Sequence, residues 1–153
     1  MIATVLIVGI SLGLFVYWFR YTVILILRTQ SSPDYAQRVA AANQLGFMVI
    51  RQQLHSRLPT QNMDGLCRDL RRDYKVLKYL LGHAAAVETG SYPVEQRLLM
   101  VNFQLLRAWF AVTLRLRPHS AKLALLEMSS TLEYFANAMG RRFATLAAET
   151  ARS

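Results

Sequence analysis

The groups in this sequence that could hold a metal or transfer a proton are three histidines, one cysteine and nine acidic residues. The histidines are His55, His83 and His119, and the cysteine is Cys67. Imidazole nitrogens bind metals and haem iron, so His55 and His119, which the topology predicted below brings to one end of a bundle, are the candidate ligands. Histidines in loops and at helix ends are more often simply exposed, and we predict no cofactor and no metal site.

The spacing of the polar residues matches no common catalytic pattern. The sequence contains no Glu-x-x-His pair, no HExxH motif, no glycine-rich phosphate loop and no nucleophile elbow. A single cysteine also excludes an internal disulfide and a CxxC redox motif. We therefore predict that the protein is not an enzyme, with no catalytic residues and no small-molecule substrate.

The elements that must position these side chains begin with an apolar segment as long as a membrane-spanning helix. Residues 2–19 contain no charged side chain, and a helix of that length spans about 27 Å, close to the thickness of a hydrocarbon core. Aromatic and basic side chains follow, as they do where a helix leaves a bilayer. We predict a transmembrane anchor over residues 1–30, with these residues at the membrane interface: Tyr17, Trp18, Phe19, Arg20, Tyr21 and Arg28.

The charges predict the orientation of this anchor. All 18 Lys and Arg residues lie at or after position 20, so the positive-inside rule predicts a single-pass protein of the inner cell membrane, with its N-terminus outside and its C-terminal domain in the cytoplasm. Arg20 either marks where the helix emerges, which we favour, or lies inside the bilayer beside an anionic partner. Gly9 and Gly13 form a GxxxG motif and are the predicted helix-packing residues, because their missing side chains let another helix approach closely.

Residues 31–153 have the periodicity of amphipathic helices joined by short connections. We predict helices at 33–57, 63–86, 93–117 and 119–147. The expected helix starts are Ser32 with Pro33, Asn62 or Asp64, and Ser91. Short connections favour antiparallel neighbours, so the predicted fold class is all-α: a single N-terminal transmembrane helix followed by an antiparallel four-helix bundle.

Apolar stripes on these helices are the expected core. On the first bundle helix the stripe is Val39, Phe47, Ile50 and Leu54. On the second it is Met63, Leu66, Leu70, Tyr74, Leu77, Leu81 and Ala84. On the fourth it is Ala121, Leu125, Met128, Leu132, Phe135, Met139, Phe143 and Leu146. A repeat at helical spacing indicates one buried face on each helix.

The third helix is apolar on more than one face, which predicts burial nearly all round. Four helices leave part of such a surface uncovered, and we expect that part to contact either the turn at 21–27 or a partner protein. The candidate partner-binding residues on this helix are Phe103, Trp109 and Phe110.

The predicted topology also gathers basic residues at the end of the bundle away from the membrane. Nine basic residues stand there against four acidic ones, namely Asp64, Asp69, Asp73 and Glu127. The candidate partner-binding residues of this group are Arg68, Arg71, Arg72 and Lys75. They either contact an acidic partner or form ion pairs along the helix, since Asp64 and Arg68 are spaced i,i+4. We do not expect nucleic acid as a partner, because no reading motif accompanies the basic residues.

The pattern as a whole resembles small single-pass accessory subunits of bacterial membrane complexes. We therefore expect a non-catalytic structural subunit whose partners are the lipid bilayer and other subunits, with the helix bundle bracing a cytoplasmic surface. The alternatives are a membrane-tethered regulator or adaptor that recruits an acidic soluble partner, and a haem- or metal-binding bundle.

Overall fold

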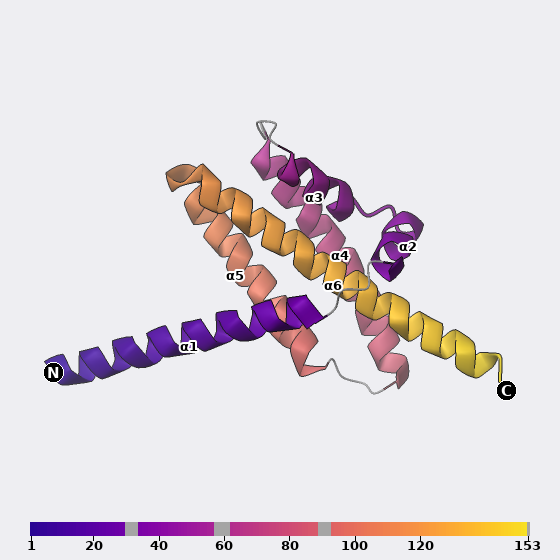
Figure 1. Cartoon of the computed structure of the whole chain (residues 1–153), viewed down its shortest axis with the longest axis horizontal. Coiled ribbons are helices and arrows are strands. Elements are labelled where there is room, and N and C mark those ends of the chain that lie inside the picture. Colours follow the sequence, from indigo (N-terminus) through magenta and orange to yellow (C-terminus); the bar gives the residue numbers. More distant parts are fainter. Residues whose placement is uncertain (30–33, 57–61, 89–92, 153) are drawn as a thin grey trace. The chain divides into compact units, whose positions relative to one another are not determined.

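The structure of the protein is a computed structural model that describes residues 1–29, 34–56, 62–88 and 93–152 (Figure 1). Within these ranges the chain is all-helical and contains no strand, so the predicted all-α class is confirmed. The chain divides into two compact units, Met1–Ser31 and Ser32–Ser153. The first unit contains α1, and the second contains α2 to α6.

The first unit is one uninterrupted helix. α1 spans Ile2–Thr29, 28 residues, and is therefore about 42 Å long. It continues as a helix through Arg20. By length and composition it is the one helix in the described part of the chain that could cross a membrane.

The second unit begins with two short helices where a single long one was predicted. α2 spans Asp34–Ala42 and α3 spans Phe47–His55, so the prediction of one helix at 33–57 is wrong. The chain leaves α2 through a Schellman motif, in which Leu45 N–H donates to Ala40 O at 2.9 Å. Gln44 has a φ of 53° and occupies the left-handed position that ends such a helix.

The three remaining helices are long and close to their predicted ranges. α4 spans Met63–Glu88, α5 spans Val94–Leu116 and α6 spans Pro118–Thr150. Asn62 starts α4, since its Oδ1 accepts a hydrogen bond from Gly65 N–H at 2.9 Å. α5 follows Pro93 without a side-chain cap, and the other predicted starts, Ser32, Pro33 and Ser91, lie outside the described residues.

The core of the second unit is built around α6. This helix packs against each of α2, α3, α4 and α5 (Figure 1), and α3 also contacts α2 and α4. Residues 134–140 of α6 are all buried, because helices cover this stretch from more than one side. Tyr74 of α4 stacks on Phe103 of α5 with ring centroids 4.2 Å apart, and Phe135 of α6 lies 6.3 Å from Tyr74. These rings join three helices at the centre of the core.

Most of the predicted core residues are buried. The stripes on α2 and α3, on α4 from Leu70 to Ala84, and on α6 from Ala121 to Met139 all lie inside the unit. Met63, Leu66 and Leu146 are only partly buried, and half of the surface of Phe143 is exposed. α6 has 33 residues against 23 in α5 and 26 in α4. Its last turns therefore extend past its neighbours, and the expected burial of Phe143 is wrong.

Two side chains from distant helices cap the short helices. Asp73 of α4 accepts hydrogen bonds from Gly46 N–H and Phe47 N–H at 2.8 and 2.9 Å, at the start of α3. Asn137 of α6 accepts one from Ala36 N–H at 2.8 Å, in the first turn of α2. The first turn of a helix has no acceptors of its own for these N–H groups. The starts of α2 and α3 are thus fixed by tertiary contacts.

α2 also packs unusually close to α6. A Cβ atom added at Gly140 of α6 would lie 2.5 Å from Cβ of Tyr35 in α2, a distance that no real pair of carbons tolerates. Gly140 and Asn137 are one turn apart, so one small region of α6 provides both the polar cap and the close approach. This region explains why α2 docks where it does.

Candidate interaction surfaces

The groups first considered for metal binding are separated in the structure. Within the described residues, no three His, Cys, Asp or Glu side chains are grouped so that they could hold a metal ion. His55 and His119 are both exposed. His83 lies against Tyr79, one turn earlier in α4, with ring centroids 4.3 Å apart. The histidines are therefore single surface or stacking residues in this part of the chain.

The perturbed titrating groups are explained by packing. Burial raises the pKa of Asp73, outweighing the two backbone N–H groups that favour its ionised form. Burial, and after it a hydrogen bond to Glu95, raises the pKa of Tyr134 to about 12. The Tyr134 hydroxyl donates to Glu95 Oε2 at 3.0 Å. Burial is also the largest cause of the raised pKa of Cys67. A raised pKa keeps the thiol protonated and weakens it as a nucleophile.

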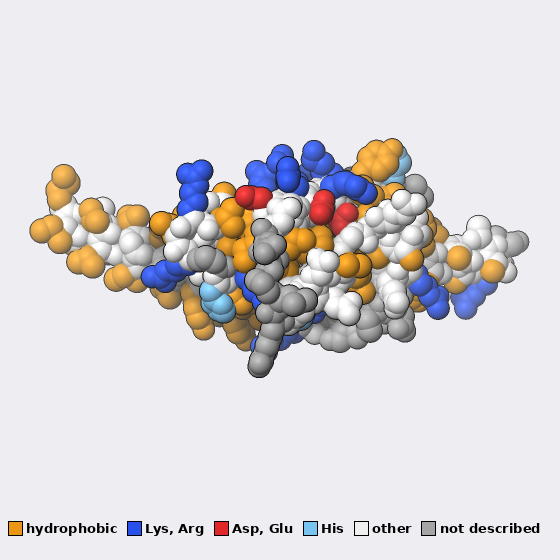
Figure 2. Space-filling model, turned by 90° about the horizontal axis from the view of Figure 1, so that it is seen from above, with side chains coloured by type: hydrophobic (Ala, Val, Ile, Leu, Met, Phe, Trp, Pro, Cys, Tyr) orange, Lys and Arg blue, Asp and Glu red, His pale blue; other side chains and the backbone are white. Residues whose placement is uncertain are grey.

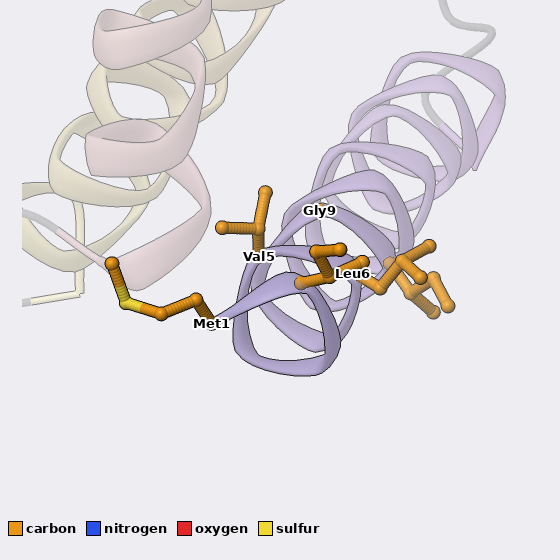
Figure 3. Close-up of a pocket in the computed structure, with 6 residues that line it drawn as sticks. Met1, Val5, Leu6 and Gly9 are labelled. Carbon is orange, nitrogen blue, oxygen red and sulfur yellow. The ribbon is translucent and has the colours of Figure 1, made fainter.

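The predicted helix-packing residues lie on an open face of α1. Cβ atoms added at Gly9 or Gly13 would have no other atom within 4 Å. Met1, Val5 and Leu6 project from the helix around Gly9 (Figure 3), and together with Ile2 and Ile10 they line a shallow apolar hollow. The missing side chain at Gly9 makes this hollow, which has the shape and polarity to receive a ridge of another apolar helix.

The predicted membrane-interface residues form a continuous aromatic band on α1. Tyr17 and Tyr21 stack with ring centroids 6.5 Å apart, and Trp18 meets Tyr21 edge-on at 6.2 Å. Phe19 stacks on Phe15 at 6.4 Å. Arg20 lies inside this band and Arg28 in the last turn of α1. The band therefore lies where the uncharged first part of the helix gives way to the part that contains charged residues.

The predicted basic residues of α4 share one exposed face. Arg68, Arg71, Arg72 and Lys75 are all exposed, while Leu70, Tyr74 and Leu77 are buried on the opposite side of the helix. Among the described residues, none of the four basic side chains forms a salt bridge with Asp64 or Asp69. In Figure 2 several Lys and Arg side chains lie along the upper edge beside Asp and Glu side chains, and other Lys and Arg side chains lie elsewhere on the surface. We call these four residues the α4 basic face.

The charged residues that were predicted to gather near the α4 basic face are not all on the surface. Asp73 is only 3% exposed, because it caps α3, so it does not offset the α4 basic face at the surface. Arg51 instead pairs with Glu133 of α6. Arg57, which belongs to the predicted basic group, lies outside the described residues.

Comparisons with known proteins add no further constraint. The chain matches no family model, no curated protein and no solved structure.

The partner-binding residues predicted on α5 divide between core and surface. Phe103 and Phe110 are 0% and 3% exposed, because they pack into the core, so their assignment to a partner surface is wrong. Trp109 is 57% exposed and remains available. The predicted burial of α5 nearly all round is also wrong, since one side of α5 packs on α6 and on Tyr74 of α4 while its other side is exposed.

Sequence reasoning missed the apolar stripe that surrounds Trp109. The stripe consists of side chains that are each more than half exposed: Val94, Val101, Leu105, Trp109, Val112 and Leu116. We call it the α5 apolar stripe. Its spacing of three, four and seven residues was visible in the sequence, but the same spacing occurs on the buried face of α5. Only the structure shows which of the two faces α6 covers.

Proposed function

We propose that the protein is a non-catalytic accessory subunit of a bacterial membrane protein complex, held in the inner membrane by α1. The observation that carries the proposal is α1 itself. It is a long apolar helix with exposed side chains from Met1 to Trp18, and an aromatic band with an arginine follows this exposed part. Exposed apolar surface of this extent needs an apolar environment, which a bilayer supplies.

We infer that the N-terminus lies outside and the second unit in the cytoplasm, because all of the basic residues follow the apolar part of α1. The second unit is best understood as a variant of an antiparallel four-helix bundle, in which α2 and α3 together replace the first helix. In support of this, each of α2, α3, α4 and α5 contacts α6.

In this proposal two separate surfaces attach the subunit to its complex. The hollow beside Gly9 receives a transmembrane helix of a neighbouring subunit. The α4 basic face contacts an acidic cytoplasmic surface, since four exposed cations on one side of a helix attract anionic groups. Neither surface belongs to the core of the second unit.

Co-purification from native membranes in mild detergent, followed by mass spectrometry, tests the proposal. We expect the wild-type protein to bring other membrane subunits with it. The pair Gly9→Leu and Gly13→Leu fills the hollow and should release them. The matched control is Ser11→Leu, which adds a side chain of the same size on the opposite side of α1.

Charge reversal tests the second surface in the same assay. Arg68→Glu, Arg71→Glu and Arg72→Glu should release an acidic partner, and added salt should weaken the wild-type contact. Arg38→Glu with Arg152→Glu is the control, because both residues are exposed and lie outside α4. If the complex survives both sets of changes, these surfaces are wrong.

The α4 basic face also favours a second candidate, a membrane-tethered adaptor that recruits an acidic soluble partner transiently. Recovery of the wild-type protein alone from native membranes would reject the accessory subunit and leave this candidate. Orientation is tested separately with fusions at Ser153. A fluorescent protein that folds only in the cytoplasm should be bright, and alkaline phosphatase activity there would reject the orientation.

A further inference from the structure

α5 presents an exposed apolar surface in a fixed direction. Leu99, Phe103, Leu106 and Phe110 hold one side of the helix in the core. The α5 apolar stripe lies on the other side, and its members are between 52% and 74% exposed. From Val94 to Leu116 the stripe extends over about 33 Å of helix. An exposed apolar stripe of this length indicates a site where the helix contacts a membrane or another protein.

Arginines line one edge of this stripe. Arg97 and Arg115 are both exposed, and their separation of 18 residues is five whole helical turns, so they lie on the same side of α5. Gln104 is exposed near the same edge. The one acidic residue of α5 is Glu95 in its first turn, which accepts a hydrogen bond from Tyr134 of α6, and no acidic residue lies between Arg97 and Leu116. The surface therefore combines apolar side chains, a tryptophan and two unopposed cations.

This combination fits the surface of an anionic bilayer better than it fits a second copy of the chain. A helix that lies in the membrane interface has an apolar face, basic residues beside it and aromatic rings at headgroup depth. A symmetric pair of α5 helices would bring together four exposed arginines and only two carboxylates, those of Glu95, each of which is already bonded to Tyr134, and this is unfavourable. The net charge of +9 also attracts the whole chain to anionic lipid.

The anchor makes this contact effectively intramolecular. If α1 spans the membrane, the second unit is tethered to the bilayer by a few residues, and a weak affinity of α5 for lipid is then sufficient. We propose that α5 lies in the headgroup layer of an anionic membrane, with the α5 apolar stripe facing the acyl chains. This inference rests on the membrane anchoring in the proposed function. It adds a second contact with the bilayer, made by α5 at the membrane surface, to the one made by α1.

The two tryptophans of the chain, Trp18 in α1 and Trp109 in α5, allow the two ideas to be tested apart. Trp109→Phe leaves Trp18 as a reporter of the anchor, and Trp18→Phe leaves Trp109 as a reporter of the stripe. Each full-length variant is reconstituted into vesicles of phosphatidylcholine and phosphatidylglycerol. Some of the acyl chains are brominated near the headgroup, and quenching of tryptophan fluorescence is measured.

We expect both reporters to be quenched, and quenching of Trp109 to need phosphatidylglycerol. Arg97→Gln and Arg115→Gln should each lower the equilibrium constant for lipid binding by α5 about fivefold. Trp18 should stay quenched in both variants. A matched control carries Trp18→Phe, Trp109→Phe and Tyr79→Trp. It places the only tryptophan at an exposed site on α4, and it should not be quenched.

Each other result has a definite meaning. Quenching of Trp18 without quenching of Trp109 overturns the lipid contact of α5 and leaves the anchor intact. A Trp109 emission that shifts to the blue with protein concentration but not with lipid identifies a protein partner, and also overturns it. Equal quenching at position 79 shows that the unit has no preferred face and rejects the proposal. Quenching of Trp109 alone supports the lipid contact and removes the anchor from the proposed function.

Discussion

Asp73 provides the sharpest test of how the short helices are held in place. One oxygen of its carboxylate, Oδ2, accepts hydrogen bonds from both Gly46 N–H and Phe47 N–H. Asp73→Ala removes this acceptor and leaves two N–H groups at the start of α3 without a partner. Asp73→Asn keeps an oxygen in the same place and removes only the charge. The two substitutions therefore separate the hydrogen bonds from the ionisation.

The size of the effect follows from burial. Asp73 is 3% exposed and Phe47 is fully buried, so water does not replace the lost acceptor freely. A buried donor without a partner costs about 1–3 kcal/mol, and truncation of an N-cap side chain costs about 0.5–2 kcal/mol. We expect Asp73→Ala to lower the free energy of unfolding by about 2–4 kcal/mol, since two donors are affected.

The raised pKa of Asp73 fixes the sign of the pH dependence. The folded protein binds the proton more tightly than the unfolded chain does, because burial disfavours the carboxylate. Stability from this group therefore increases as the pH falls through the raised pKa toward 3.8, and is smallest at neutral pH. Asp73→Asn should equal or exceed the wild type at pH 7 and lose this part of the pH dependence.

Denaturant unfolding of the full chain in one detergent, followed by circular dichroism between pH 4 and 7, measures both quantities. Hydrogen exchange at Gly46 and Phe47 locates the effect, and should accelerate in Asp73→Ala before it does in α5. A loss below about 0.5 kcal/mol in Asp73→Ala would mean that the cap is unimportant. A loss in Asp73→Asn as large as in Asp73→Ala would mean that the charge, which we treat as unfavourable, is what holds α3.

Three further changes test the packing around α6 by the same unfolding measurement. Leu132→Ala removes a fully buried side chain and should cost about 2–5 kcal/mol, whereas a loss near zero would place Leu132 outside the core. Gly140→Ala should destabilise by about 1–3 kcal/mol, because its Cβ would lie 2.5 Å from Tyr35; a gain from better helix propensity would contradict the close approach. Tyr134→Phe should cost about 1 kcal/mol at pH 7 through loss of the hydrogen bond to Glu95. Since the folded pKa is about 12 against 10, the wild type should lose this advantage as the pH rises from 10 to 12, and an unchanged difference over that range would refute the assignment.

The periodic parts of the fold were predictable from the sequence. Leu70, Leu77, Leu125 and Leu132 repeat at helical spacing, and all four are fully buried, because one long helix face against another leaves little choice of which side turns inward. Asn62 was also identifiable as a cap, since it acts on a residue only three positions away. A cap can be predicted from the sequence when its donor and its acceptor lie within a few residues of each other.

The parts that failed depend on partners far away in the chain. Gln44 is not a residue that predicts a left-handed φ. The chain after the break is held by Asp73 of α4, and the start of α2 is held by Asn137 of α6. The sequence also could not show which of the two apolar faces of α5 is buried. Phe103 and Trp109 look equivalent in the sequence, and only the position of α6 decides that the first is buried and the second exposed.

The central position of α6 has a consequence for how the protein is made. A ribosome delivers α6 after α2, α3, α4 and α5, yet each of those helices finds its main packing partner in α6. The hydrogen bond from Ala36 to Asn137 closes a loop of 101 residues, so α2 emerges long before its cap exists. Throughout that interval the apolar faces of four helices are exposed, and chaperones and proteases act on such surfaces. A chain cut short before Pro118 would keep every one of those faces uncovered, and we expect the cell to degrade it rather than accumulate it.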